Sequence, residues 1–234
     1  MTVEGFVLNS PGPLSQRAQR FLTTRAHRVD FDRGLTGDAL AKKIEEVYGR
    51  SRVGIVSLLD RLQERYGGLT YKSGYFDEQA TFSPVCEPDD PSDELEILYA
   101  VTTGAPTGAS VHIDGVVEIG FDERGIAEFA SLDYLIECDA IFDVAGEWSE
   151  SKALYLDKGI FSEVHARLLS GEIANVEMLP EATGNHSSWF LGEDVGIFVC
   201  RTWSELQLPM QPFMKIWSAD ERVAGNVANR VLQG

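Results

Sequence analysis

The sequence predicts an α+β protein in which helices at both chain ends flank an antiparallel sheet. Apolar residues recur at helical spacing within residues 38–66 and again near the end of the chain, whereas residues 95–129 contain short apolar strands that reverse at turn residues. Helices and hairpins that are segregated in this way are typical of the α+β class. We expect a basic lead over residues 1–37 and one domain over residues 38–234, in which residues 145–234 are a candidate C-terminal extension.

The first expected helices come before a paired glycine. In "GDALAKKIEEVYG", Asp38 is a candidate N-cap and Gly49 ends the apolar pattern. A second helix over residues 53–66 leads into Gly67 and Gly68, where Gly67 suits the left-handed position that ends a helix. A phosphate-binding glycine loop would instead lead into a helix, because the free N–H groups at the helix start face the anion. The paired glycine therefore predicts a structural turn and no nucleotide site.

The clearest strand signal is "SVHIDGVVEIGFDERGIAEFAS", residues 110–131. Asp114 and Gly115 form the favoured pair for a two-residue hairpin turn, and "DERG" reverses the chain again directly afterwards. These turns predict a three-stranded meander. Ser131 then caps an apolar helix that we expect to cover the meander, and a later hairpin is expected to turn at residues 192–194.

Charge is the most unusual property of the chain, whose formal net charge is −17. Residues 1–72 hold 12 basic and 8 acidic side chains, whereas residues 73–234 hold 8 basic and 29 acidic ones. A field of this sign repels nucleic acid and anionic membranes and speeds the encounter with a basic partner. Solubility alone is the other explanation of the acidic excess. The sequence shows neither a secretory signal nor a membrane-spanning apolar run, which predicts a cytoplasmic protein.

The cysteines do not suggest metal or redox chemistry. Cys86, Cys138 and Cys200 are widely spaced and odd in number, and none belongs to a CxxC pair. We expect them to be buried, reduced thiols.

One stretch contains the residue types of a hydrolytic triad. "ATGNHSSWF" places His186 beside Ser187 and Ser188, and Asp194 follows. However, the chain has no nucleophile elbow of the GxSxG type, and neighbouring residues of a strand point to opposite faces. A polar loop that enters a strand is the favoured interpretation.

Two acidic clusters are candidates for metal binding. The first lacks the spacing and the glycine of a calcium-binding loop, and the second lacks a histidine in its sequence neighbourhood. Solvated acidic surfaces explain both, so no metal and no cofactor is expected. The clusters are Asp89, Asp90, Asp93 and Glu94, and Glu137, Asp139 and Asp143.

Three segments resemble the SUKH superfamily: the helix that ends in "ERYGGLTY", the meander "VHIDGVVEIGFDERGIAEF" and the helix that opens with "SLDYLIE". They cover roughly residues 50–143. Bacterial members of this superfamily are mostly immunity proteins that neutralise polymorphic or contact-dependent toxins, and eukaryotic members act as adaptors. The resemblance implies that Gly67, Gly68 and Ser131 define the fold and have no catalytic role.

The resemblance and the charge together predict a non-catalytic immunity protein that binds a basic toxin, such as a nuclease. An intracellular adaptor of the same fold is the alternative, and a hydrolase that uses His186 or the acidic cluster is the third hypothesis. The predicted partner-binding surface consists of carboxylates around an aromatic residue, in the meander and the helix after it: Asp122, Glu123, Glu128, Asp133, Glu137, Asp139, Asp143 and Trp148.

Overall fold

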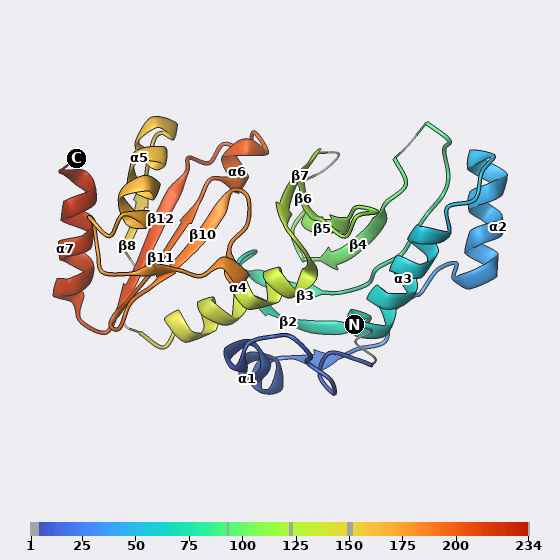
Figure 1. Ribbon diagram of the computed structural model, residues 1–234, viewed down its shortest axis with the longest axis horizontal. Helices are drawn as coiled ribbons and strands as arrows, with labels where there is room; N and C mark the ends of the chain where they lie inside the picture. The colour runs from blue at the N-terminus through green and yellow to red at the C-terminus, as the bar shows by residue number, and fades with distance from the viewer. Residues whose placement is uncertain (1–4, 93, 122–123, 149–151, 234) are drawn as a thin grey trace. The chain divides into compact units, whose positions relative to one another are not determined.

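The chain folds into two compact units, residues 1–132 and 133–234 (Figure 1). The computed structural model describes residues 5–92, 94–121, 124–148 and 152–233. The predicted α+β class is confirmed, since all strand pairs among these residues are antiparallel. The prediction of a single domain over residues 38–234 is wrong, because each unit has its own sheet.

The first unit is a seven-stranded sheet with three helices, and its strands follow one another in chain order from β1 to β7. The meander predicted from its turns is confirmed and is longer than expected. The elements are α1 (Gln16–Arg25), β1 (His27–Arg28), α2 (Gly37–Tyr48), α3 (Val53–Tyr66), β2 (Leu69–Ser73), β3 (Glu78–Thr81), β4 (Ile97–Thr102), β5 (Thr107–Val111), β6 (Val117–Phe121) and β7 (Arg124–Phe129).

The predicted basic lead, residues 1–37, belongs to the first unit. Val7 is fully buried, and its N–H donates to the carbonyl oxygen of Arg65 at 2.8 Å. The buried guanidinium of Arg65 in turn donates to the carbonyls of Ser10 at 3.2 Å and Pro11 at 3.0 Å. These bonds fix residues 7–11 on α3, so the part of the lead that the structure describes does not form a separate segment.

The paired glycine is a structural turn, as predicted, but its geometry differs in one respect. Gly67 caps α3 with φ −56°, and Gly68 is the left-handed residue with φ +81°. The N–H of Gly68 donates to Phe82 and its carbonyl accepts from Val29, both at 2.8 Å. Gly68 therefore connects the end of α3 directly to the sheet that begins at Leu69.

The hairpin between β5 and β6 forms where Asp114 and Gly115 predict it, with a loop one residue longer. The N–H of His112 donates to the carbonyl of Val116 at 2.9 Å, which leaves three residues in the loop. Gly115 has φ +93°, and the Asp114 carboxylate accepts a bond from the N–H of Val116 at 3.0 Å. Glycine satisfies the positive φ without strain.

The second unit is a five-stranded sheet with the order β8-β12-β11-β10-β9. The predicted hairpin at residues 192–194 connects β10 to β11 and is confirmed. The elements are α4 (Leu132–Ala145), β8 (Lys152–Tyr155), α5 (Lys158–Leu169), β9 (Glu177–Met178), the 3-10 helix η1 (Pro180–Ala182), β10 (Ser187–Leu191), β11 (Val195–Cys200), α6 (Thr202–Glu205), β12 (Phe213–Ser218) and α7 (Glu221–Leu232).

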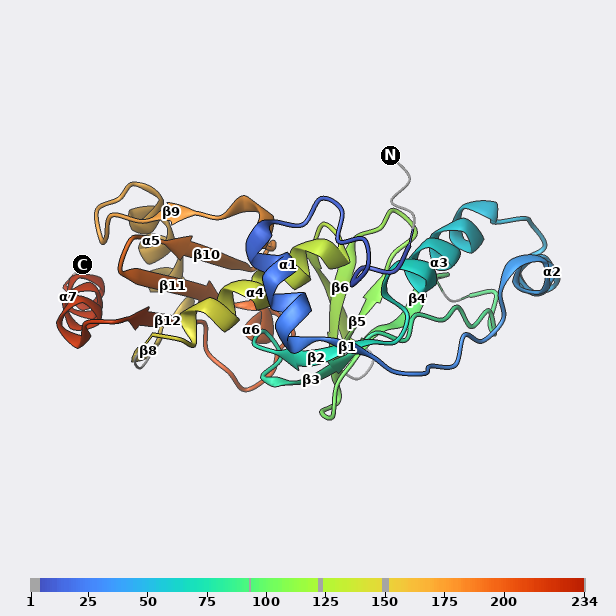
Figure 2. The same cartoon turned by 90° about the horizontal axis from the view of Figure 1, so that it is seen from below.

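Helices cover both faces of the second sheet. On one face, Phe190 and Ile197 pack in a core with apolar residues of α5 and α7 (Figure 1 and Figure 2). On the other face, the ring of Phe142 from α4 lies 4.8 Å from the rings of Trp189 and Phe198. The helix that we expected to cover the meander thus packs on the sheet of the second unit.

Candidate functional site

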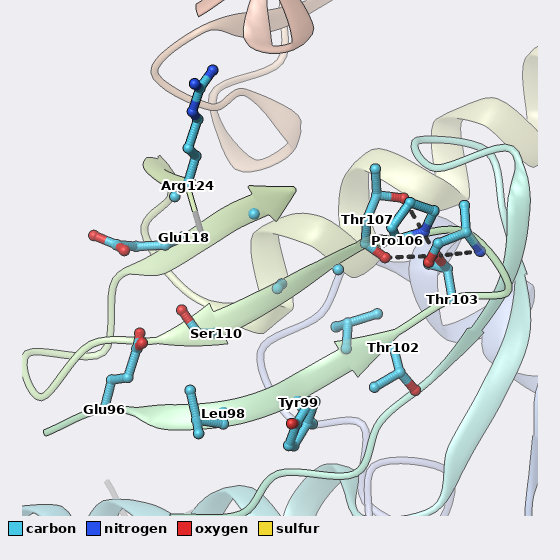
Figure 3. Close-up of a pocket in the computed structure, with 16 residues that line it drawn as sticks. Glu96, Leu98, Tyr99, Thr102, Thr103, Pro106, Thr107, Ser110, Glu118 and Arg124 are labelled. Atoms are coloured by element: carbon cyan, nitrogen blue, oxygen red, sulfur yellow. Dashed lines mark hydrogen bonds between the residues drawn. The ribbon is translucent and has the colours of Figure 1, made fainter. Parts of the chain in front are cut away.

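A hollow of about 470 Å³ lies on one face of strands β4 to β7 in the first unit (Figure 3). Side chains alternate along these strands, so Val111 and Ile119 are buried in the core. The neighbouring residues Ser110, Glu118 and Gly120 line the hollow on the opposite face. No helix of the first unit lines this hollow among the residues that the structure describes.

A row of glycines forms the floor of the hollow. Gly108 of β5 is paired with Gly120 of β6, and Gly120 is paired with Gly125 of β7. A Cβ atom on Gly108 would lie 2.6 Å from the carbonyl oxygen of Val101, so a side chain does not fit there without rearrangement. Glycine inside a strand often marks a place where a ligand or another chain approaches the backbone closely.

Carboxylates gather at one end of this floor. Figure 3 shows Glu96, Ser110 and Glu118 at the same end of the hollow, and Ser110 is the cross-strand partner of Glu118. The pKa of Glu118 is raised by its burial and next by the negative charge of Glu96, while His112 lowers it. Glu94 adds to the repulsion. The free protein therefore holds negative charges close together, and a bound cation would relieve their repulsion.

At the other end of the hollow, the side chain of Thr103 forms hydrogen bonds to the backbone of the turn between β4 and β5. The Thr103 hydroxyl donates its single proton to the carbonyl oxygen of Thr107, 2.6 Å away, and that of Ala105, at 3.0 Å, is a second acceptor within reach. The hydroxyl also accepts a bond from the N–H of Ala105 at 3.2 Å. These bonds cross the turn between β4 and β5 and fix the shape of this end.

Tyr99 lines the hollow in a strained backbone conformation. It lies in a register shift between Ile97 and Val101 and has φ +51°, and its side chain is 52% exposed. A left-handed conformation is unusual for an aromatic residue and costs about 1–2 kcal/mol. Strain of this kind persists mainly at functional positions. Tyr99 is therefore a candidate contact residue.

We expect Tyr99→Asn to raise the free energy of unfolding by about 0.5–1 kcal/mol, because asparagine tolerates the left-handed region. Urea unfolding followed by circular dichroism measures the change. Tyr155→Asn is the control, because this tyrosine is 67% exposed on β8 and has no positive φ. A Tyr99→Asn variant less stable than the Tyr155→Asn variant would contradict the assignment of strain.

The partner-binding surface predicted from the sequence is only partly exposed. Glu128, Glu137 and Asp139 are 1, 4 and 1% exposed, and the prediction is wrong for these three. Helix α4 carries apolar residues around most of its circumference, so carboxylates in its middle turns are covered as well. Asp133, Asp143 and Trp148 are half-buried, whereas Asp122 and Glu123 lie outside the described residues.

The Ser/His/Asp triad is not assembled. His186 and Ser188 line one hollow of the second unit, and Asp194 lines another. The histidine within hydrogen-bond distance of Ser188 is His165, whose Nε2 lies 3.1 Å from the serine Oγ. His165 stands on α5, and nothing in its sequence spacing predicts this contact.

The described residues show no metal-binding cluster and no membrane-spanning helix, and the three cysteines are buried. In the described parts of the chain, no group of three or more His, Cys, Asp or Glu side chains is arranged to hold a metal ion, and Asp93 lies outside those parts. Cys86, Cys138 and Cys200 are buried free thiols, as predicted, and burial raises the pKa of Cys86 to about 11. None of the described helices has the length and apolar character needed to cross a membrane.

No protein-family model, curated protein or solved structure matches this chain. Its class follows from the structure itself, an α+β protein with two antiparallel sheets and a hollow on one face of the first. The resemblance to the SUKH superfamily stays a prediction.

Proposed function

We propose that the protein is a non-catalytic binding protein that neutralises a basic protein toxin by taking a lysine or arginine side chain of it into the hollow on β4 to β7. The observation that carries the proposal is the pair of carboxylates, Glu96 and Glu118, at one end of a floor without side chains. Repulsion between them is relieved when a cation binds.

The lining of the hollow suits a long basic side chain. The aliphatic stem of a lysine or arginine can lie along the glycine row, because Gly108 and Gly120 are half-buried and Gly125 is exposed. Its charged end then reaches Glu96 and Glu118, and arginine can bind a carboxylate through two parallel hydrogen bonds. Exposed Tyr99 supplies an aromatic contact of the kind that is common at interface centres.

The charge of the whole chain supports a basic partner. A net charge of −17 speeds the encounter with a positively charged protein and disfavours nucleic acid as a ligand. The resemblance to the SUKH superfamily is the reason for proposing a toxin. An adaptor of the same fold would use the same hollow for a harmless partner, and this is the second candidate.

We expect the double variant Glu96→Gln, Glu118→Gln to lose at least about tenfold in affinity for the partner, because a hydrogen bond to a charged group contributes about 1.5–3 kcal/mol. The wild-type chain and the variant are immobilised, and basic proteins retained from a source-cell lysate are quantified by mass spectrometry. The control is Glu45→Gln, Glu46→Gln on α2, which changes the net charge equally at exposed positions outside the hollow.

The outcomes test the location of the binding site and the biological role of the protein separately. Equal retention by both double variants would show that the hollow is not the binding site. If only the Glu96, Glu118 variant loses a protein, that protein is expressed in a test host with and without this chain. Growth arrest that the chain reverses supports neutralisation of a toxin, whereas a harmless partner supports the adaptor.

A further inference from the structure

A second hollow, of about 290 Å³, lies within the second unit. Residues of α5, β9, β10 and the segment before β10 line it, together with Arg201 at the end of β11. Its lining includes one arginine and two histidines, and none of its lining residues is acidic. This composition is unusual in a chain with a net charge of −17.

Arg201 differs from the other arginines of this unit. Its guanidinium carbon lies 5.9 Å from the ring centre of Phe161, but in the described ranges the guanidinium forms no hydrogen bond and no ion pair. Its main-chain N–H donates to the carbonyl of His186 at 2.9 Å, which fixes the position of the residue beside the hollow. Carboxylate or carbonyl oxygens accept hydrogen bonds from the other three arginines: Arg167, Arg222 and Arg230.

The two histidines are suited to donate hydrogen bonds as neutral imidazoles. Burial lowers the pKa of both His165 and His186, and the positive charge of Arg201 lowers it further. Glu205 acts on His186 in the opposite direction with a smaller effect. Ser188 is buried beside His165, 3.1 Å from its Nε2, so a hydroxyl completes the polar lining.

We propose that this hollow binds a small oxyanion group, a carboxylate or a phosphate, between Arg201 and the imidazoles of His165 and His186. A guanidinium that no described residue pairs with matches the oxygens of either group, and binding would give it a directly hydrogen-bonded counter-charge. Phe161 and Met178 offer apolar surface to the rest of a ligand, and the volume lies near the lower end for small-molecule pockets. The site lies in a different unit from the hollow on β4 to β7, so it does not depend on the proposed toxin binding.

The proposal implies that binding depends on pH. A bound anion favours the charged form of a nearby imidazole, so it raises the pKa of both histidines. By linkage, the anion binds more tightly as the pH falls through the pKa values of the complex. Arg201 opposes protonation of both rings, and Glu205 favours protonation of His186, so the anion must outweigh Arg201.

The test is a titration of the whole chain with inorganic phosphate, and separately with acetate, at constant ionic strength. The imidazole Cε1–H signals of all four histidines are followed by NMR, and His27 and His112 of the first unit serve as internal controls. We expect saturable shifts of His165 and His186 alone, and a rise of at least about half a unit in both pKa values. The anion that binds more tightly identifies the ligand class.

Variants of Arg201 test whether the NMR shifts of His165 and His186 depend on its guanidinium. Arg201→Gln is expected to weaken binding at least tenfold, and Arg201→Lys, which retains the charge without the planar fork, several-fold. Arg222→Gln removes an exposed arginine that lies outside the hollow, and it should bind like the wild-type chain. Absence of a saturable shift with both anions, equal shifts of all four histidines, or wild-type affinity in Arg201→Gln would each overturn the proposal.

Discussion

Replacement of Gly68 by alanine is expected to lower the free energy of unfolding by more than about 3 kcal/mol. The residue has φ +81°, where a side chain costs about 1–2 kcal/mol. In addition, a Cβ atom at this position would overlap the main-chain oxygen of Val29. Gly68 cannot move aside, because its N–H and carbonyl are bonded to Phe82 and Val29. The two costs therefore add.

Circular dichroism during urea unfolding measures this loss. Gly54→Ala is the matched control, since Gly54 lies in α3, has no positive φ and has no atom within 4 Å of the added Cβ. The control should be as stable as the wild-type chain or up to about 1 kcal/mol more stable. All four tryptophans lie in residues 133–234, so their fluorescence reports on the second unit separately. Similar stability of Gly68→Ala and Gly54→Ala would contradict the geometric argument.

Local signals in the sequence predicted much of the fold. The end of α3 at the paired glycine and the hairpin at Asp114 and Gly115 both depend on residues that are adjacent in the chain. The division into two units depends on which sheet α4 packs against. The apolar residues of α4 are spread around the helix, so its sequence pattern does not indicate a partner. The contact of Phe142 with the second sheet was therefore beyond sequence reasoning.

The hollow on β4 to β7 was missed because its defining feature is distributed over three strands. Gly108, Gly120 and Gly125 lie on three different strands, and each alone indicates only a weak position within its strand. The register of the structure pairs Gly108 with Gly120 and Gly120 with Gly125. The two-residue turn predicted at Asp114 and Gly115 would instead pair Gly108 with Phe121, so the row of glycines depends on a loop length that the sequence pattern did not predict.

The acidic surface was predicted wrongly in part because counting charges assumes that each carboxylate is solvated. Glu128, Glu137 and Asp139 are buried, whereas Glu96 and Glu118, which were not selected, line the hollow. The same count obscured Arg201, because a single cation changes little in a total of −17. Its significance lies in a guanidinium that forms no hydrogen bond or ion pair with the residues that the structure describes, and only the folded chain shows this.

The second large effect is expected for Trp189→Ala, which should lower the free energy of unfolding by about 3–5 kcal/mol. Trp189 is fully buried, and its ring lies 4.8 Å from that of Phe142 and 5.1 Å from those of Phe198 and Trp217. The truncation leaves a cavity and removes aromatic contacts that contribute about 0.5–1.5 kcal/mol each beyond burial. Urea unfolding followed by far-UV circular dichroism measures the loss, since the mutation itself changes the fluorescence.

The variant Trp189→Phe distinguishes the contribution of ring packing to stability from the cost of burying the indole N–H. The indole N–H of Trp189 is buried and forms no hydrogen bond to any residue that the structure describes. A buried donor without a partner costs about 1–3 kcal/mol, and phenylalanine removes it while it retains an aromatic ring. The lost volume and the removed penalty oppose each other, so Trp189→Phe should destabilise the protein by about 1 kcal/mol or less. Equal losses in Trp189→Phe and Trp189→Ala would show that the N–H carries no such penalty and that the packing of the full indole ring determines the stability of this face.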